Sequence, residues 1–148
     1  ENRKGDLRAV AGYRPAGGGA LFLEQYLANP VEQDLSRRVS APVSREQIVE
    51  VGNLAGGSCR HARQLVSLLP RYFLEHGYTW AVFTATSLVR EILTSVGASI
   101  IELAPADAGR LSAGREAWGR YYQNDPRVMA GYLPTALELS CRRRRIRS

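Results

Sequence analysis

The stretch IVEVGNLAGGSCRHA, residues 48–62, decides the fold. It opens with β-branched residues, which are typical of a buried strand, and this run carries a single carboxylate, that of Glu50. A glycine-rich turn follows this run. A helical pattern then begins at Ser58, and serine is favoured at helix N-termini. The sequence therefore predicts a strand, a flexible turn and a helix in this order.

A second strand completes a β-α-β unit. Residues 59–76 carry apolar side chains at helical spacing, Gly77 supplies a stop, and WAVFTAT, residues 80–86, has the composition of a strand. Such units join parallel neighbours by a right-handed crossover. Pro70 lies inside the helical stretch and is expected to bend or split the helix.

The residues before this unit are expected to begin with an antiparallel hairpin. Residues 8–16 and 20–27 both look extended, and three glycines separate them. Asn29 can cap a short helix over about residues 30–38, with proline at its first position. The expected buried residues of this helix are Val31 and Leu35.

Three further elements are predicted after the β-α-β unit. A helix begins after Thr86 or Ser87 and ends at Gly97, and strands follow at SIIELA, residues 99–104, and VMAGYL, residues 128–133. The order of elements predicts an α/β fold with a mixed sheet, in which an antiparallel hairpin comes first and a parallel pair lies in the middle.

The composition is that of an ordinary globular chain. Its 148 residues suit one domain, predicted over residues 1–141, and 45% of them are hydrophobic. No apolar run approaches the ~18 residues of a membrane-spanning helix, and the first ten residues have no hydrophobic signal segment. With two cysteines, a disulfide framework is not expected, so the cytoplasm is the predicted location.

The net charge of +6 belongs to the end of the chain. Residues 142–148 contain five arginines, so the rest of the chain carries 6 − 5 = +1. This run is expected to be a solvated, disordered tail that could attract nucleic acid or an acidic partner at long range. It has no interleaved aromatic residues, so its specificity for nucleic acid would be poor. Nucleic acid is therefore not the expected partner, although a binding module without catalysis that uses this run on nucleic acid stays an alternative.

Four segments in order along the chain carry a resemblance to a known family. They are LFLEQYLANPVEQ, REQIVEVGNLA, YTWAVFTAT and WGRYYQNDPRVMAGY, between residues 21 and 132. Together they resemble the bacterial thermostable haemolysin family, within the GNAT N-acyltransferase superfamily. The resemblance implies a GNAT-like mixed central sheet with helices on both faces and a parallel strand pair splayed at its centre. It also implies that the strand and helices that usually precede the hairpin are missing, so part of the acceptor wall would be absent or supplied by a partner.

The resemblance places an acyl donor in the gap between the parallel strands. There the pantetheine arm of coenzyme A or of an acyl carrier protein would pair with backbone groups near Val51, Asn53 and Leu54. Thr84 and Thr86 would bond the arm from the opposite side, although threonine is also a common strand residue. The expected phosphate cradle at the helix N-terminus consists of Gly56, Gly57, Ser58, Arg60 and His61.

The cradle departs from the superfamily's usual loop at two positions. Gly57 stands where Arg or Gln is expected, and Arg60 stands where a glycine is expected. A carrier-bound phosphopantetheine has one phosphate and no adenine nucleotide. It would therefore need fewer contacts from this loop than coenzyme A does.

Two residues are candidates for catalysis. Glu50 shares a strand face with Ile48 and is the first choice as the base that deprotonates a small-molecule amine. The alternative is an ordinary strand carboxylate, solvated or ion-paired with Arg90 or Arg120. Tyr122, or its neighbour Tyr121, offers a phenol that could protonate the departing thiolate, although such tyrosines more often pack in a core.

Two further carboxylates are candidates for the acceptor side. Glu24 and Glu32 lie in the first family-like segment, although an exposed hairpin carboxylate and a capping glutamate explain them about as well. The two histidines and two cysteines do not have zinc-ligand spacing, so no metal is expected, and Cys59 is interpreted as a small turn residue.

The resemblance thus implies an acyltransferase that acts on an amine. Two other classes stay open: a haemolysin-like protein that perturbs membranes, which no visible amphipathic insertion segment supports, and a binding module without catalysis.

Overall fold

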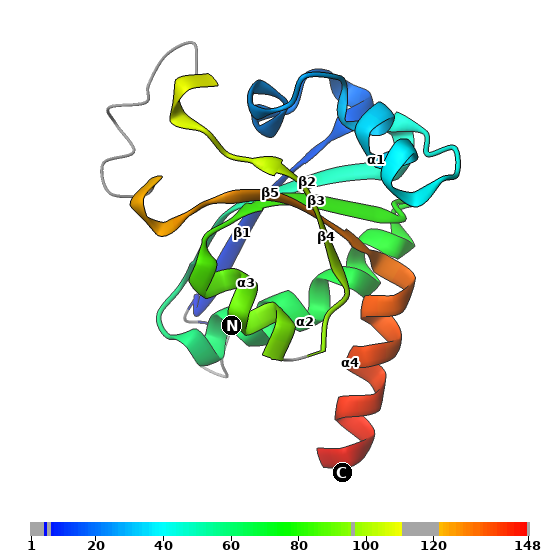
Figure 1. Ribbon diagram of the computed structural model, residues 1–148. Coiled ribbons are helices and arrows are strands. Elements are labelled where there is room, and N and C mark those ends of the chain that lie inside the picture. Colours follow the sequence, from blue (N-terminus) through cyan, green and yellow to red (C-terminus); the bar gives the residue numbers. More distant parts are fainter. Residues whose placement is uncertain (1–4, 6, 96, 111–121, 148) are drawn as a thin grey trace.

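The sheet is organised around β2 (Ile48–Gly56), the strand that the opening stretch predicts. The computed structural model describes residues 5, 7–95, 97–110 and 122–147. β1 (Ala9–Pro15) pairs antiparallel with β2, and β2 pairs parallel with β3 (Trp80–Ala85). β4 (Ile100–Pro105) and β5 (Arg127–Tyr132) extend the sheet by antiparallel pairing, and the strand order is β1-β2-β3-β5-β4 (Figure 1). The predicted mixed α/β sheet is confirmed.

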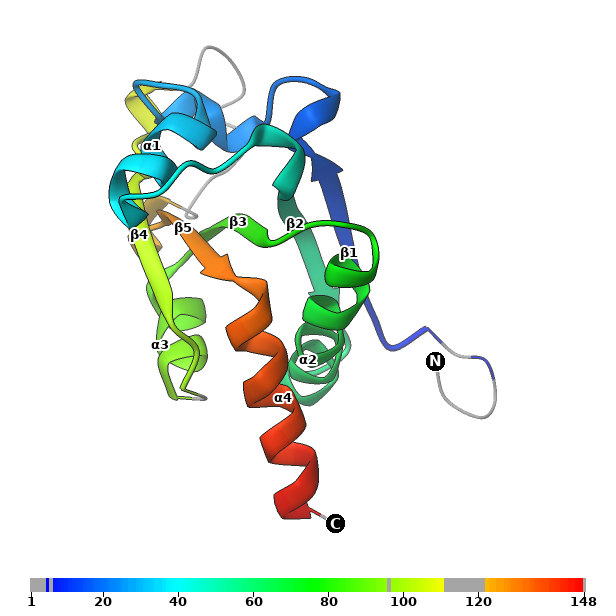
Figure 2. The same ribbon diagram turned by 90° about the vertical axis from the view of Figure 1, so that its right-hand side faces the viewer.

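Helices cover both faces of this sheet. They are α1 (Val31–Val39), α2 (Cys59–Glu75), α3 (Ser87–Ser95) and α4 (Leu133–Arg147). Figures 1 and 2 show α1 on one face and the other three on the opposite face. Gly77 and Gly97 end α2 and α3 with positive φ angles of 90° and 80°, as their predicted role as helix stops requires. α2 runs through Pro70 without being split.

Two hydrophobic cores follow from the alternation of side chains along the strands. Ile48 and Val82 are fully buried on the α1 side, together with Leu35 of α1. Val49 is buried on the opposite side against Phe73 of α2. Because successive strand residues point to opposite faces, the face that buries Ile48 is also the face of Glu50.

The predicted N-terminal hairpin is wrong. β1 takes β2 as its partner, and residues 22–26 form a 3-10 helix, η2 (Phe22–Tyr26). The buried residues around η2 do not alternate as a strand requires: they are Leu21, Leu23, Tyr26 and Leu27. The side chain of Glu24 accepts the amide of Leu21 at 2.8 Å and so closes a turn.

Three short 3-10 turns complete the described chain. They are η1 (Ala16–Gly18), η3 (Arg45–Gln47) and η4 (Ala108–Arg110). The predicted helix after Asn29 is present as α1, and Val31 and Leu35 are fully buried as expected.

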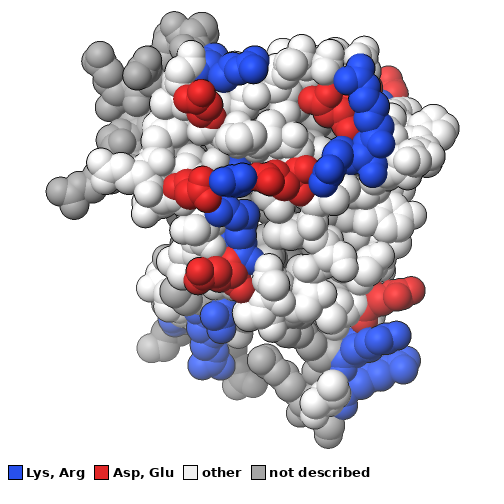
Figure 3. Space-filling model, viewed as in Figure 1, with Lys and Arg blue, Asp and Glu red and all other residues white. Residues whose placement is uncertain are grey.

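The basic end of the chain is helical up to Arg147, whereas a disordered tail was expected. α4 continues from the end of β5 and packs along α2, and its last turns project beyond the body of the molecule (Figure 2). Figure 3 shows basic side chains gathered at this end, while acidic and basic side chains alternate over the upper part of the same view. Because its first turns pack against α2, the helix is nucleated there and continues into the basic segment.

Candidate functional site

The parallel strands β2 and β3 separate near the middle of the sheet. They are paired through only three facing positions, the last of which is Glu50 with Val82. β2 nevertheless stays paired with β1 up to Gly56, and β3 stays paired with β5 up to Ala85. Beyond Glu50, the facing edges of β2 and β3 therefore have no strand-to-strand ladder between them, which is the splayed pair that the resemblance implies.

The predicted donor-arm residues lie on both sides of this gap. Val51, Asn53 and Leu54 belong to the part of β2 beyond its last pairing with β3. Across the gap, Thr84 is paired with Val128 of β5 at the other edge of β3. Thr86 follows β3, and its carbonyl accepts the amide of Arg90 at 3.0 Å.

The predicted phosphate cradle forms the turn between β2 and α2. Gly56 ends β2, and the amide of Gly57 donates to the carbonyl of Arg8 at 3.0 Å. Ser58 caps α2: its Oγ accepts the amide of His61 at 3.2 Å and lies 2.9 Å from His61 Nδ1. Arg60 is exposed beside this turn, and the first helical amides, before that of His61, have no acceptor within the helix.

Glu50 holds the N-terminus of η2. Its Oε2 accepts the amide of Phe22 at 3.0 Å, and its Oε1 accepts the amide of Leu23 at 2.9 Å. The ion pair with Arg90, which was one sequence-based alternative, is not formed, since Arg90 donates to Asp125 Oδ2 at 2.8 Å instead. Arg120, the other suggested partner, lies outside the described residues.

Glu24 and Glu32 are brought together by Arg45, a residue that sequence reasoning missed. Arg45 Nη1 donates to both carboxylates at 2.8 Å, and Nη2 donates to Glu24 Oε1 at 2.6 Å. Glu24 Oε2 also accepts the amide of Val31 at 3.0 Å, so this carboxylate caps α1. Hydrogen bonds from Arg45 and from the amides of Leu21 and Val31 outweigh partial burial and lower the pKa of Glu24 from 4.5 to about 2.

Tyr122 is tied to the core. Its hydroxyl lies 2.8 Å from that of Tyr26, and its ring packs against the core on the α1 side. Tyr26 is buried at the end of η2. The structure therefore packs the ring of Tyr122 on the same face as Glu50, with its hydroxyl bonded to that of Tyr26. Tyr121 lies outside the described residues.

Asp125 joins three elements beside the open end of the gap. Its side chain accepts from Arg90 of α3 and from Arg127 of β5, and its φ angle is +50°. Arg90 also donates to the carbonyl of Ala85, the last residue of β3. The Asn-Asp-Pro sequence at 124–126 is the one signal that could have indicated this turn, because Asn and Asp adopt positive φ more readily than other residues.

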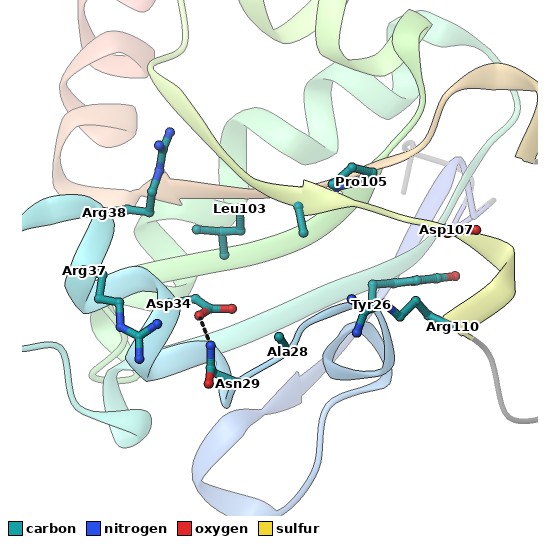
Figure 4. Close-up of a pocket in the computed structure, with 11 residues that line it drawn as sticks. Tyr26, Ala28, Asn29, Asp34, Arg37, Arg38, Leu103, Pro105, Asp107 and Arg110 are labelled. Atoms are coloured by element: carbon teal, nitrogen blue, oxygen red, sulfur yellow. Dashed lines mark hydrogen bonds between the residues drawn. The ribbon is translucent and has the colours of Figure 1, made fainter.

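Two neighbouring cavities lie on the α1 side of the sheet. One, of about 400 Å³, is bounded by α1, by the end of η2 and by the end of β4 (Figure 4). The other, of about 600 Å³, contains the Glu24–Arg45–Glu32 cluster and shares Ala28 and Asn29 with the first. Their volumes lie in the range of small-molecule sites, and both are open to solvent, the larger one being shallow.

The described part of the chain contains neither a cluster of metal ligands nor a membrane-spanning helix. It holds no group of three or more His, Cys, Asp or Glu residues that could bind a metal ion. Its helices include none long and apolar enough to span a bilayer.

Three solved structures resemble this fold. The CoA-dependent acyl-homoserine lactone synthase MesI matches with a TM-score of 0.55 and 14% identity, over 93% of this chain and 63% of MesI. TofI in a ternary complex with an inhibitor and MTA matches with a TM-score of 0.57 and 10% identity, over 93% of this chain and 65% of TofI. TofI in an apo form matches with a TM-score of 0.56 and 11% identity, over 93% of this chain and 69% of TofI. At these identities the likeness establishes the fold, and the chain spans less than two thirds of the first two proteins.

Sequence comparison gives the family. No protein with a curated description matches the chain significantly. The family profile for thermostable hemolysin matches residues 1–137, which is most of the sequence and includes every strand. The chain belongs to the thermostable hemolysin family.

Proposed function

We propose that this protein is a GNAT-type acyltransferase that moves an acyl group from a pantetheine thioester to a small-molecule amine. The gap between β2 and β3 carries the proposal. An extended arm with amide groups can pair with an open strand edge as an added strand does, and β2 offers such an edge from Val51 onward. The likeness in fold to MesI, a CoA-dependent acyl-homoserine lactone synthase, supports a thioester donor.

The donor would lie along the gap with its phosphate toward α2. Coenzyme A and phosphopantetheine on an acyl carrier protein share this arm, so the proposal includes both. The helix N-terminus after Ser58 favours negative charge, and Arg60 adds a cation beside it. Thr84 would bond the arm from the β3 side.

Glu50 is the proposed base, and η2 holds it in place. Each carboxylate oxygen accepts one backbone amide, and each has a second lone pair that can accept a proton from the attacking amine. The attack forms the new C–N bond and expels the thiolate, to which Tyr122 is the proposed proton donor. The hydroxyl of Tyr26 orients that phenol.

Thiol release tests the function. Purified protein is offered acyl-CoA and acyl carrier protein donors of several chain lengths, each with a panel of amines. Glu50→Gln should lower kcat by roughly 10² to 10⁴-fold if a positioned base is lost, with little change in the KM for the donor. Glu75→Gln, an exposed glutamate on α2, is the matched control.

A structural role for Glu50 predicts a different result. Glutamine has one acceptor oxygen where glutamate has two, so Glu50→Gln lowers stability under either role. A purely structural residue would lose activity only in proportion to the loss of folded protein, so thiol release per folded molecule would stay unchanged. Absence of thiol release with every donor would reject the acyltransferase proposal.

Membrane perturbation is the second candidate, and the family match favours it by name. Leakage of a dye from liposomes at physiological salt tests it, with a heat-denatured sample as the control. Leakage that is independent of any acyl donor would favour this candidate over acyl transfer.

A further inference from the structure

The cavity of about 400 Å³ is lined by three exposed arginines that have no ion pair in the described part of the chain. Arg37 and Arg38 leave the last turn of α1, and Arg110 ends η4 on the far side of the cavity. None of the three makes an ion pair within 4 Å among the described residues. Figure 4 shows Arg37 near one end of the cavity and Arg110 beside Tyr26 near the other, while the side chain of Arg38 extends away from both at the rim.

The two carboxylates in the cavity wall are already engaged locally. Asp34 Oδ1 accepts from Asn29 Nδ2 at 3.1 Å, and Asp107 Oδ1 accepts the amide of Gly109 at 2.9 Å. Three arginines and two aspartates give the wall a net charge of 3 − 2 = +1. Guanidinium groups bind carboxylate and phosphate with paired, charge-assisted hydrogen bonds, so the chemistry of this wall suits an anion.

η2 connects this cavity to Glu50. The amides of Phe22 and Leu23 at its beginning bond to Glu50, and Tyr26 at its end lines the cavity. Four steps of a 3-10 helix span roughly 8 Å. The amides that hold Glu50 and the residue that lines the cavity are thus at opposite ends of η2, and an acceptor that joins the two must span at least this distance.

We propose that this cavity binds an anionic group, carboxylate or phosphate, of the acceptor amine. The inference rests on the proposed acyltransferase function and specifies its acceptor: an amine whose nitrogen reaches Glu50 while an anionic group several bonds away lies between α1 and η4. Arg37, Arg38 and Arg110 are the specificity residues in this assignment.

Binding in the absence of any acyl donor tests the cavity itself. The probes are 4-aminobutyrate, 3-aminopropyl phosphate and n-butylamine, measured by calorimetry at low ionic strength. One or both anionic amines should bind at least about tenfold more tightly than n-butylamine, and this preference should be lost in Arg37→Gln/Arg38→Gln and in Arg110→Gln. Comparison of the first two probes distinguishes carboxylate from phosphate.

Arg63→Gln is the matched control, because Arg63 is an exposed arginine on α2, away from the cavity. It should leave binding unchanged. Arg37→Lys/Arg38→Lys keeps the charge and should retain part of the preference, which separates electrostatic recognition from a loss of folding. Equal binding of all three probes, undiminished binding in the arginine variants, or no binding of either anionic amine would overturn the proposal.

Acyl-transfer assays separate this inference from the function on which it rests. The arginine variants should raise the KM for an anionic amine about tenfold with kcat unchanged. If all donors fail to release thiol while the anionic amines bind as predicted, the acyltransferase proposal fails and the anion site stands. If transfer proceeds equally well to n-butylamine and in the variants, the anion site fails and the acyltransferase stands.

Discussion

At the scale of single residues, Arg45 organises the segment that precedes β2. Its guanidinium group makes five hydrogen bonds, which use all its N–H donors: two backbone carbonyls and two glutamates accept them. Its side chain is 23% exposed, and those of Glu24 and Glu32 are 16% and 25% exposed. The cluster fixes η1, η2 and α1 relative to the start of β2.

Removing Arg45 should destabilise the fold. Arg45→Ala leaves two partly buried carboxylates without a cation, and the expected loss is about 2 kcal/mol of unfolding free energy. Arg45→Lys should recover only part, because an ammonium cannot make the bidentate contact with Glu24. Urea denaturation measures both. The control is Arg71→Ala, which removes the exposed ion pair between Arg71 and Glu75. If Arg45→Ala lowers the free energy of unfolding no more than the control does, the Glu24–Arg45–Glu32 cluster does not stabilise the fold.

The same cluster makes stability depend on acid pH. The pKa of Glu24 in the folded protein is about 2, against an ordinary value of 4.5. Since the folded pKa is the lower one, the stabilisation is complete above about pH 4.5 and is lost as the pH falls toward 2. Melting temperatures from pH 6 to pH 2 should therefore fall more steeply for the native chain than for Glu24→Gln. Parallel profiles would show that Glu24 does not contribute.

Glu24 and Arg45 show where reading single residues from sequence stops. Glu24 could be selected as a family-like carboxylate. Its position as the cap of α1, however, is fixed by a partner, Arg45, which lies 21 positions away along the chain. No periodicity or spacing marks Arg45 as that partner. Glu50 is similar, since its face could be inferred from alternation, whereas its bonds to the η2 amides depend on how residues 21–27 turn.

At the scale of elements, local signals were sufficient where they were strong. β2, α2, β3 and α3 were anticipated from β-branched runs, helical periodicity, a serine cap and glycine stops. The hairpin was misread because an apolar segment of eight residues fits a strand and a turn about equally, and only the capping by Glu24 and Glu50 decides for η2. The splay of β2 from β3 leaves no local trace, and only the family resemblance predicted it.

The cap of α2 gives a prediction at this scale. Ser58→Ala removes the acceptor of the His61 amide, and the expected cost is about 1 kcal/mol of unfolding free energy. Ser58→Thr keeps the hydroxyl and should restore most of it. Thermal unfolding followed by circular dichroism compares the two. If alanine and threonine behave alike, the capping bond is not a source of stability.

At the scale of the whole molecule, charge is distributed unevenly. The last seven residues carry five of the six net positive charges, and residues 142–147 form the end of α4 that projects from the body. Over the upper part of the face in Figure 3, positive and negative side chains alternate. Long-range attraction of polyanions is thus concentrated at one end of the protein.

Replacing those five arginines with glutamine should lower the net charge from +6 to +1 and weaken binding to a DNA oligonucleotide. The reason is that fewer counterions are released, so the dependence of the binding constant on salt should flatten as well. Titration at several salt concentrations measures both, while the proposed acyl transfer to small amines should be retained. Unchanged salt dependence would assign any DNA binding to another surface.

The narrow join between β2 and β3 divides the sheet into a two-stranded part and a three-stranded part that share three facing positions. Along β2 beyond Glu50, alternate amides are held by β1, and those between them are left to solvent or to a bound arm. Deuterium should therefore enter every second amide of this segment quickly in the free protein. Occupancy of the gap should slow that uptake and make the two parts of the sheet open together as one cooperative unit.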